Sequence, residues 1–349
     1  MPLDTAEQRR DDQGSTSALA ATMLSEGSST PASSDNIARR RFRGLLRVAK
    51  DLPLTDPKGT YSEAEIQLQP CLPTIISNGV RKADRAPGAR AWHTPSHLSA
   101  LSKHLRDAGY EVVAPRLPSC NLDADPGDAM AKDANVIAAA IKSTTDAGKD
   151  VVLFGHSYGG TAASEGLALY FSSLEGAAPA EPAQGKIVRL VFLTALLLNQ
   201  GQSAAAQNIL SAADPSMPPP QISHEGIVLP PRPDDEVARE MTISRLYNAT
   251  PPDLAEEALD GMTGYALSAY TQPTKYQGWS VAGVPATYIL CGNDQAWPPV
   301  QQRQCIERMK TAGVEVEVVE QGGWDHSPYL GHAAEVAQIV RDAVESQAG

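Results

Sequence analysis

A glycine-flanked serine stands where a strand-like segment meets a helix-like one. Residues 151–160 read VVLFGHSYGG, and the helix-forming stretch 161–169 follows. A serine hydroxyl becomes a usable nucleophile when a tight strand-to-helix turn lifts it clear of the backbone beside a base. Gly155 and Gly159 leave room for such a turn around Ser157. The pattern predicts that Ser157 is a nucleophile, and a serine in an ordinary turn is the alternative.

A nucleophilic serine needs a base at the same edge of the sheet, and the chain has seven histidines. His326 lies in the turn-rich segment GGWDHSP, residues 322–328, directly after the last predicted strand. A loop in this position can carry an imidazole across the edge of the sheet, so we expect His326 to be the base. The other histidines are expected to be structural, pocket-lining or exposed: His93, His97, His104, His156, His224 and His332.

The base needs a carboxylate that fixes its tautomer and stabilises its protonated form. Asp294 follows the predicted strand that ends at Cys291, within the segment CGNDQAWPP. The preceding apolar strand ends in LNQ, residues 198–200, with no carboxylate. We therefore expect Asp294 to be the acid, although an aspartate there could simply stabilise a turn. Asp325 is the weaker alternative, because it adjoins His326 and is too constrained to reach its ring.

The segments that must position these residues alternate between strands and helices. Strands are expected at 72–76, 111–115, 151–154, 187–197, 285–291 and 314–319, and helices at 95–108, 128–145, 161–169, 300–312 and 333–346. This alternation is typical of an α/β protein with a doubly wound, mostly parallel sheet. A proline-rich stretch from about 199 to 280 breaks the alternation and predicts a helical cap over the carboxyl edge of the sheet. We assign residues 66–349 to this domain and interpret residues 1–65 as a disordered or loosely attached extension.

Charge and composition narrow the classes of partner. The chain has 349 residues and a formal net charge of -12, which argues against nucleic acid or an anionic membrane as a general partner. It has no apolar run long enough to span a membrane and no secretory signal, so we expect a cytoplasmic location. The four cysteines are far apart, which favours reduced thiols. We interpret the basic cluster at 39–47 as a solvated face. We expect a small-molecule substrate, no cofactor and no metal, and the oligomeric state stays open.

Five motifs together resemble the α/β-hydrolase superfamily. They are WHTP at 92–95, RLPS at 116–119, HSYGG at 156–160, DQAWPP at 294–299 and HSP at 326–328. The resemblance covers the chain from about residue 70 and is strongest to an esterase-like branch, which is related to plant methyl-salicylate and methyl-jasmonate esterases and hydroxynitrile lyases. It implies the α/β-hydrolase fold, with Ser157 as nucleophile, Asp294 as acid and His326 as base, in that chain order. It also implies that the backbone N–H of Tyr158 is one oxyanion donor.

The segment 77–90 departs from the family's pattern. Family members usually run from the first core strand straight into a short loop that supplies the second oxyanion donor. Here PGA at 87–89 resembles that loop, and Ala89 is the expected donor, with Gly88 or Ala91 next. Charged residues precede it and would be costly inside a buried sheet, so we expect the segment to loop out beside the site. It is either a functional embellishment or an artefact such as a retained intron.

These residues predict a serine hydrolase that cleaves a carboxylic ester, lactone or thioester of a small apolar molecule through an acyl-enzyme. One alternative keeps the fold and changes the reaction to C–C bond hydrolysis, lyase chemistry or acyl transfer in secondary metabolism. Another is a catalytically impaired, hydrolase-like binding protein, in which the insertion has disrupted the oxyanion hole. The identity of the substrate depends on cap side chains that the sequence does not place.

Overall fold

The computed structural model describes residues 74–78, 93, 95–121, 125, 127–175, 184–207, 221–280 and 283–345. All of them belong to one compact unit that spans residues 34–349. The extension predicted for residues 1–65, the basic cluster at 39–47 and the predicted oxyanion donor Ala89 lie outside the described residues.

The described residues form a central six-stranded sheet in the spatial order β2-β1-β3-β4-β7-β8. Its strands are β1 (Thr74–Asn78), β2 (Tyr110–Val113), β3 (Val151–His156), β4 (Ile187–Leu193), β7 (Ala286–Cys291) and β8 (Val316–Gln321). From β3 to β8 all neighbours are parallel, whereas β1 is antiparallel to both β2 and β3. The predicted α/β fold with a mostly parallel sheet is confirmed. The loops that follow β3, β4, β7 and β8 therefore gather at one edge.

The direction of β1 corrects the expectation for the segment that begins at Ser77. Ser77 and Asn78 continue the strand instead of looping out, and Ser77 pairs with Val151 at the start of β3. The strand therefore ends at the amino edge of the sheet, opposite the end of β3. In this register Ile75 pairs with Leu153 and Ile76 pairs with Val152. An antiparallel pairing satisfies the backbone hydrogen bonds as fully as a parallel one.

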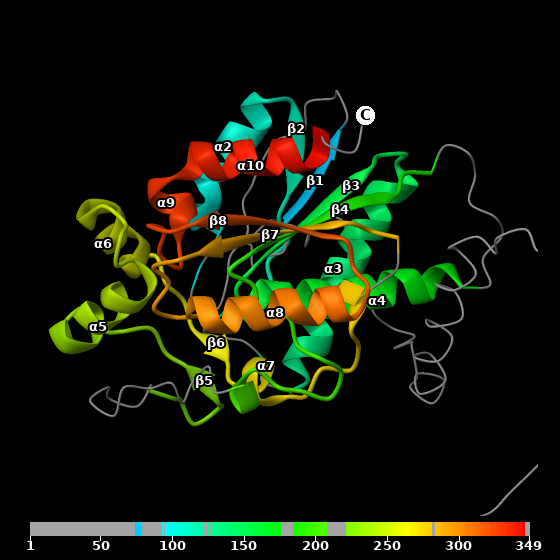
Figure 1. Cartoon of the computed structure of the whole chain (residues 1–349). Helices are drawn as coiled ribbons and strands as arrows, with labels where there is room; N and C mark the ends of the chain where they lie inside the picture. Colours follow the sequence, from blue (N-terminus) through cyan, green and yellow to red (C-terminus); the bar gives the residue numbers. More distant parts are fainter. Residues whose placement is uncertain are drawn as a thin grey trace, which may run out of the picture. The chain divides into compact units, whose positions relative to one another are not determined.

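Helices cover both faces of the sheet (Figure 1). One layer consists of α3 (Ala129–Asp146), α4 (Tyr158–Leu174) and α8 (Pro299–Thr311). The other consists of α2 (Ser99–Asp107), which continues the 3-10 helix η2 (Pro95–Leu98), and α10 (Ala333–Glu345), with the short α9 (Pro328–Gly331) before it. Successive strand residues alternate between the two layers: Leu153 and Phe192 pack toward α3, α4 and α8, and Phe154 and Val191 pack toward α2 and α10.

The chain between β4 and β7 forms the cap. Its described elements are η3 (Ala205–Gln207), β5 (Ile227–Val228), α5 (Glu236–Leu246), α6 (Pro252–Asp260), β6 (Tyr265–Ala266), α7 (Ser268–Thr271) and η4 (Gly278–Ser280). The helices α5 and α6 lie within the stretch for which the sequence predicts a helical cap, and Figure 1 shows them together at the left of the sheet. The strands β5 and β6 pair into a small antiparallel sheet.

Two further expectations concern the chain as a whole. Among the described helices, none is both long and apolar enough to cross a membrane. Cys120 and Cys305 are buried free thiols, as the sequence predicts. Cys291 is buried as well, and Cys71 lies outside the described residues.

Candidate active site

Ser157 stands in a strained turn between β3 and α4. Its backbone has φ 52° and ψ -130°, a conformation that is uncommon outside glycine. The turn is tight because β3, α4 and the segment after β4 approach one another closely. A Cβ on Gly155 would lie 3.0 Å from the Cα of Gly160, and one on Gly160 would lie 2.6 Å from the Cβ of Ala195. Gly160 is thus a structural requirement that the five-residue pattern around the serine does not include.

The three residues predicted to act together are in hydrogen-bond contact. Oγ of Ser157 lies 3.0 Å from Nε2 of His326, and Nδ1 of His326 lies 2.8 Å from Oδ2 of Asp294. A carboxylate only accepts hydrogen bonds, so Nδ1 donates to Asp294 and Nε2 is left to accept the serine proton. All three side chains are buried. This geometry can move a proton from the serine to the imidazole and stabilise the imidazolium that forms.

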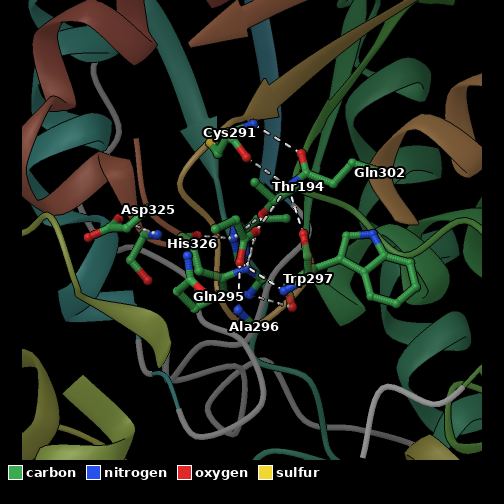
Figure 2. A network of polar contacts seen from close by, with 12 residues as sticks. Thr194, Cys291, Gln295, Ala296, Trp297, Gln302, Asp325 and His326 are labelled. Carbon is green, nitrogen blue, oxygen red and sulfur yellow. Dashed lines mark hydrogen bonds and ion pairs between the residues drawn. The ribbon is translucent and has the colours of Figure 1, made fainter. Parts of the chain in front are cut away.

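Asp294 is held by several donors besides His326. Its Oδ1 accepts the backbone N–H groups of Ala296 and Trp297, each at 2.8 Å. Its Oδ2 also accepts Nε2 of Gln302 at 3.2 Å, and Figure 2 shows Gln302 reaching into this loop from α8. Together these donors hold the carboxylate in one orientation, with Oδ2 toward Nδ1 of His326.

Gln302 was missed by sequence reasoning, although a signal exists. Its side chain is fully buried and contacts the loop that carries Asp294, residues 292–298, which we call the acid loop. It accepts from the N–H of Cys291 and donates to the carbonyls of Cys291 and Trp297. It shares one face of α8 with the buried Cys305 and Ile306. A glutamine on the apolar face of a helix needs buried partners, and that is the signal.

His156 and Thr194 contact the loop and the ring of His326. Nε2 of His156 donates to the carbonyl of His326 at 2.8 Å and lies 2.9 Å from Oγ1 of Thr194, and its ring packs edge-on against the His326 ring. Thr194 has φ 42°, which is rare for a β-branched residue, and its Oγ1 is 3.5 Å from Nδ1 of His326. His156 is therefore structural, as expected.

The end of β4 corrects a second expectation. The strand stops at Leu193, so the residue at its carboxyl end is Thr194 and not the segment 198–200. The sequence predicts a longer strand because the apolar run continues past Leu193 into the following loop. The residue at the corrected strand end also carries no carboxylate.

Asp325 binds the cap. Its Oδ2 accepts the backbone N–H of Ala249 at 2.9 Å and the hydroxyl of Thr250 at 2.8 Å, while its Oδ1 accepts the N–H of Ser327 at 2.8 Å. Two of these donors belong to the cap, and the third belongs to the same loop as Asp325. Figure 2 shows Asp325 to one side of the contacts that surround the acid loop.

Tyr158, whose backbone N–H is the first predicted oxyanion donor, is the first residue of α4. The first N–H groups of a helix have no partner within the helix, so they are suited to an anion. Its hydroxyl donates to Oδ2 of Asp133 at 2.8 Å, and its ring stacks on Tyr270. Oδ1 of Asp133 accepts the N–H of Ser119 at 2.9 Å. Burial raises the pKa of Asp133 to about 7, against the opposing effect of these hydrogen bonds.

The remaining histidines contact other parts of the molecule or are exposed. His93 is hydrogen-bonded to the hydroxyl of Tyr247, and Nε2 of His97 lies 2.7 Å from the carbonyl of Ala258, so both join the start of η2 to the cap. The others are at the surface: His104 and His224 are exposed, and His332 stacks on Trp324 and faces Glu335. Within the described part of the chain, no group of three or more His, Cys, Asp or Glu side chains could hold a metal ion.

A parallel sheet with helices on both faces, and a buried serine, histidine and aspartate on its carboxyl-edge loops, defines the α/β-hydrolase architecture. The sequence model of the alpha/beta hydrolase family matches residues 85–339. The chain therefore belongs to the alpha/beta hydrolase family and is a hydrolase by class.

Individual relatives are distant. The alpha/beta hydrolase nvfD of Aspergillus novofumigatus is 27% identical over 263 residues, which cover 74% of this chain and 94% of the relative. Polyneuridine aldehyde esterase has a solved structure that matches with a TM-score of 0.51 at 18% identity, covering 71% of this chain and 93% of that one. The methylesterase MES16 of Arabidopsis matches with a TM-score of 0.51 at 16% identity, covering 72% and 93%. At these identities the two structures support the fold alone.

Proposed function

We propose that the protein is a serine hydrolase that cleaves a carboxylic ester of a small apolar molecule through an acyl-enzyme. The observation that carries the proposal is the unbroken pair of hydrogen bonds from Ser157 to His326 and from His326 to Asp294. The chemistry of this arrangement is nucleophilic acyl transfer, because it both activates a hydroxyl and stores the proton that is released.

The positions of these atoms support a reaction in two stages. Oγ of Ser157 attacks the carbonyl carbon while Nε2 of His326 takes the hydroxyl proton, and the charge that develops on the carbonyl oxygen is stabilised by the N–H of Tyr158. Collapse of this tetrahedral species expels the alcohol, which receives the proton from His326. Water then attacks the acyl-serine with His326 again as the base, and the carboxylic acid leaves with the serine restored. Ala89 is our proposal for the second oxyanion donor.

The substrate class is inferred from the family and from similar structures. Two similar structures belong to an esterase and a methylesterase, and an ester of a compact alcohol is the substrate we favour for this chain. Lactones and thioesters present the same carbonyl to the serine and are the next candidates. We also propose a role in secondary metabolism and a cytoplasmic location, as the sequence predicts.

The test combines labelling with a substrate screen. A fluorophosphonate should label the wild-type protein covalently, and it should not label Ser157→Ala or His326→Ala. A screen of short-chain aryl esters, lactones and thioesters, with identification of the products, then separates ester hydrolysis from C–C bond cleavage and acyl transfer. Failure of the wild-type protein to react with any fluorophosphonate would support the binding-protein alternative and overturn the proposal.

A further inference from the structure

One turn of the cap contacts the loop of Asp294, the loop of His326 and the chain just before η2. It consists of residues 247–250, between α5 and α6, and we call it the clasp turn. It is closed by a hydrogen bond from the N–H of Thr250 to the carbonyl of Tyr247 at 3.0 Å. We propose that the clasp turn sets the relative positions of Asp294 and His326, so that Thr250 and Asp325 are positioning residues for the reaction. This inference rests on the proposed function.

The strongest contact of the clasp turn is with the loop of His326. Asp325 accepts one hydrogen bond from the backbone of Ala249 and one from the hydroxyl of Thr250, and both its own side chain and that of Thr250 are buried. A buried carboxylate is costly unless it is hydrogen-bonded, so these two donors hold Asp325 in one orientation. Because His326 is the next residue, a fixed Asp325 also restricts the backbone from which the imidazole projects.

A second contact reaches the loop of Asp294. Nδ2 of Asn248 donates to the carbonyl of Asn293 at 3.0 Å. The N–H of Asn293 in turn donates to the carbonyl of Trp324 at 3.0 Å. This bond joins the acid loop directly to the loop that carries His326. The clasp turn therefore bonds to the residue immediately before Asp294 and to the residue immediately before His326.

A third contact connects the clasp turn to the start of η2. The hydroxyl of the buried Tyr247 is hydrogen-bonded to His93. His93 follows directly on the segment that is predicted to deliver the second oxyanion donor. The same cap element thus bonds to chain segments next to the acid, the base and the expected oxyanion segment.

Apolar packing supports these bonds. Buried apolar residues of the cap form a cluster that includes Tyr247, Ala258 and Leu259. Two residues from outside the cap pack against it, Ala296 of the acid loop and Leu330 of α9. There is little free space behind the turn, since a Cβ on Gly331 would lie 3.1 Å from Cδ of Pro251. A change in the clasp turn is therefore transmitted to both loops, because close-packed neighbours cannot absorb it.

The positioning role predicts a particular kinetic pattern. A displacement of about 1 Å at reacting groups can lower a rate by about 10²-fold. Thr250→Val removes one hydroxyl with little change of shape, and Asp325→Asn replaces an acceptor of the Ala249 N–H by a group that can present a donor there. Each should lower kcat by about 10- to 100-fold, with KM changed less than about twofold, since the contacts lie behind the loops and not on the substrate.

The matched control is Thr242→Val. Thr242 lies on α5 in the same cap, but its hydroxyl donates only to the carbonyl of Ala238 within its own helix at 2.7 Å. We expect kcat and KM of this variant to equal those of the wild type. The double variant Thr250→Val with Asp325→Asn should lose less activity than the product of the two single losses, because both changes break the same hydrogen bond.

Hydrogen exchange provides a readout that does not depend on activity. In Thr250→Val, backbone amides of 292–298 and 323–330 should exchange faster than in the wild type, and those of the distant α3 should not change. Faster exchange confined to α5 and α6, or an unchanged kcat in folded Thr250→Val and Asp325→Asn, would overturn the positioning role. If fluorophosphonate does not label the wild type, the proposed function is overturned instead. Hydrogen exchange of the two loops in Thr250→Val would still decide whether the clasp turn holds them.

Discussion

His326 takes its carboxylate partner from Asp294, 32 residues away in the chain, although Asp325 is its immediate neighbour. Nδ1 of His326 lies 2.8 Å from Oδ2 of Asp294, while the carboxylate of Asp325 bonds to Ala249, Thr250 and Ser327. Adjacent residues on a loop point their side chains in different directions, and here one direction leads to the serine and the other to the cap. Two neighbouring residues can therefore have separate roles in one reaction.

This arrangement ranks two aspartate variants. Asp294→Asn should lower kcat by about 10⁴-fold, because an amide at this position favours the wrong tautomer of the imidazole. Asp325→Asn should cost far less, within the range given above for a positioning residue. Steady-state kinetics on one aryl ester, with melting temperatures to verify folding, compare the two. A larger loss in Asp325→Asn than in Asp294→Asn would mean that the acid has been assigned to the wrong residue.

The strained backbone of Ser157 leads to a prediction about stability. Its φ of 52° is tolerated by glycine, and such a conformation typically costs an L-residue about 1–3 kcal/mol. Ser157→Ala and Ser157→Gly should both abolish hydrolysis, because neither has a hydroxyl. Ser157→Gly should unfold at a higher temperature than Ser157→Ala, since only the glycine relieves the strain. Calorimetry measures the difference, and equal melting temperatures would show that the turn stores no strain.

Gln302 tests how far the acid loop depends on a single buried side chain. Gln302→Leu keeps a similar volume but leaves the N–H and carbonyl of Cys291 and the carbonyl of Trp297 without their partner, at about 1–3 kcal/mol for each unsatisfied group. We expect a clear fall in melting temperature and a lower kcat at temperatures where the variant is folded. Gln304→Leu, at an exposed position of the same helix, is the control and should change neither. Similar results for the two variants would contradict a role for Gln302.

The elements were predictable because their signals are local. Helix periodicity, turns and apolar runs located most strands and helices to within a few residues, and the loops after β3, β7 and β8 then placed Ser157, Asp294 and His326 at one edge. The side-chain contacts around them were not predictable, since they join distant segments. Asp133 meets Tyr158 across 25 residues, and Ala249 meets Asp325 across 76. Such contacts depend on packing, and the antiparallel direction of β1 likewise has no local signal in the sequence.

The buried carboxylate of Asp133 predicts a pH dependence of stability. Its pKa is raised by burial to about 7 from 3.8, so the folded protein binds more protons at this group than the unfolded chain between those pH values. Its contribution to the free energy of unfolding is therefore fully present below about pH 4 and is lost as the pH rises through about 7.

Asp133→Asn should remove this contribution while keeping an oxygen for one of the two donors. The free energy of unfolding should fall less steeply between about pH 4 and 7 than in the wild type, as measured by urea unfolding at several pH values. The slope should not vanish, because burial also raises the pKa of Glu165 to about 7. An identical pH dependence in Asp133→Asn and the wild type would mean that Asp133 is ionised throughout this range.

The last prediction concerns residues 78–86, which separate β1 from the Pro-Gly-Ala segment at 87–89. In the full chain β1 runs toward the amino edge of the sheet, whereas His93 is hydrogen-bonded to Tyr247 of the cap. Residues 79–92 connect the two in the sequence. Deleting 78–86 leaves only the six residues 87–92 for this connection. Fully extended, they span roughly 20 Å, about the length of β3, with nothing left for a turn.

The deletion should therefore reverse β1 into the parallel direction, which is only slightly less stable per residue than the antiparallel one. Ser77 would then lead directly into 87–89 at the carboxyl edge and deliver the N–H of Ala89 beside Ser157. We expect the variant to be at least as stable as the wild type and more active, by up to about 10²- to 10³-fold if the deletion brings the N–H of Ala89 closer to the oxyanion than it is in the full chain. A control that keeps the length and replaces Arg81, Lys82, Asp84 and Arg85 by serine should not gain activity. A folded but inactive deletion variant would instead identify residues 78–86 as a working part of the site, since the triad itself would be unchanged.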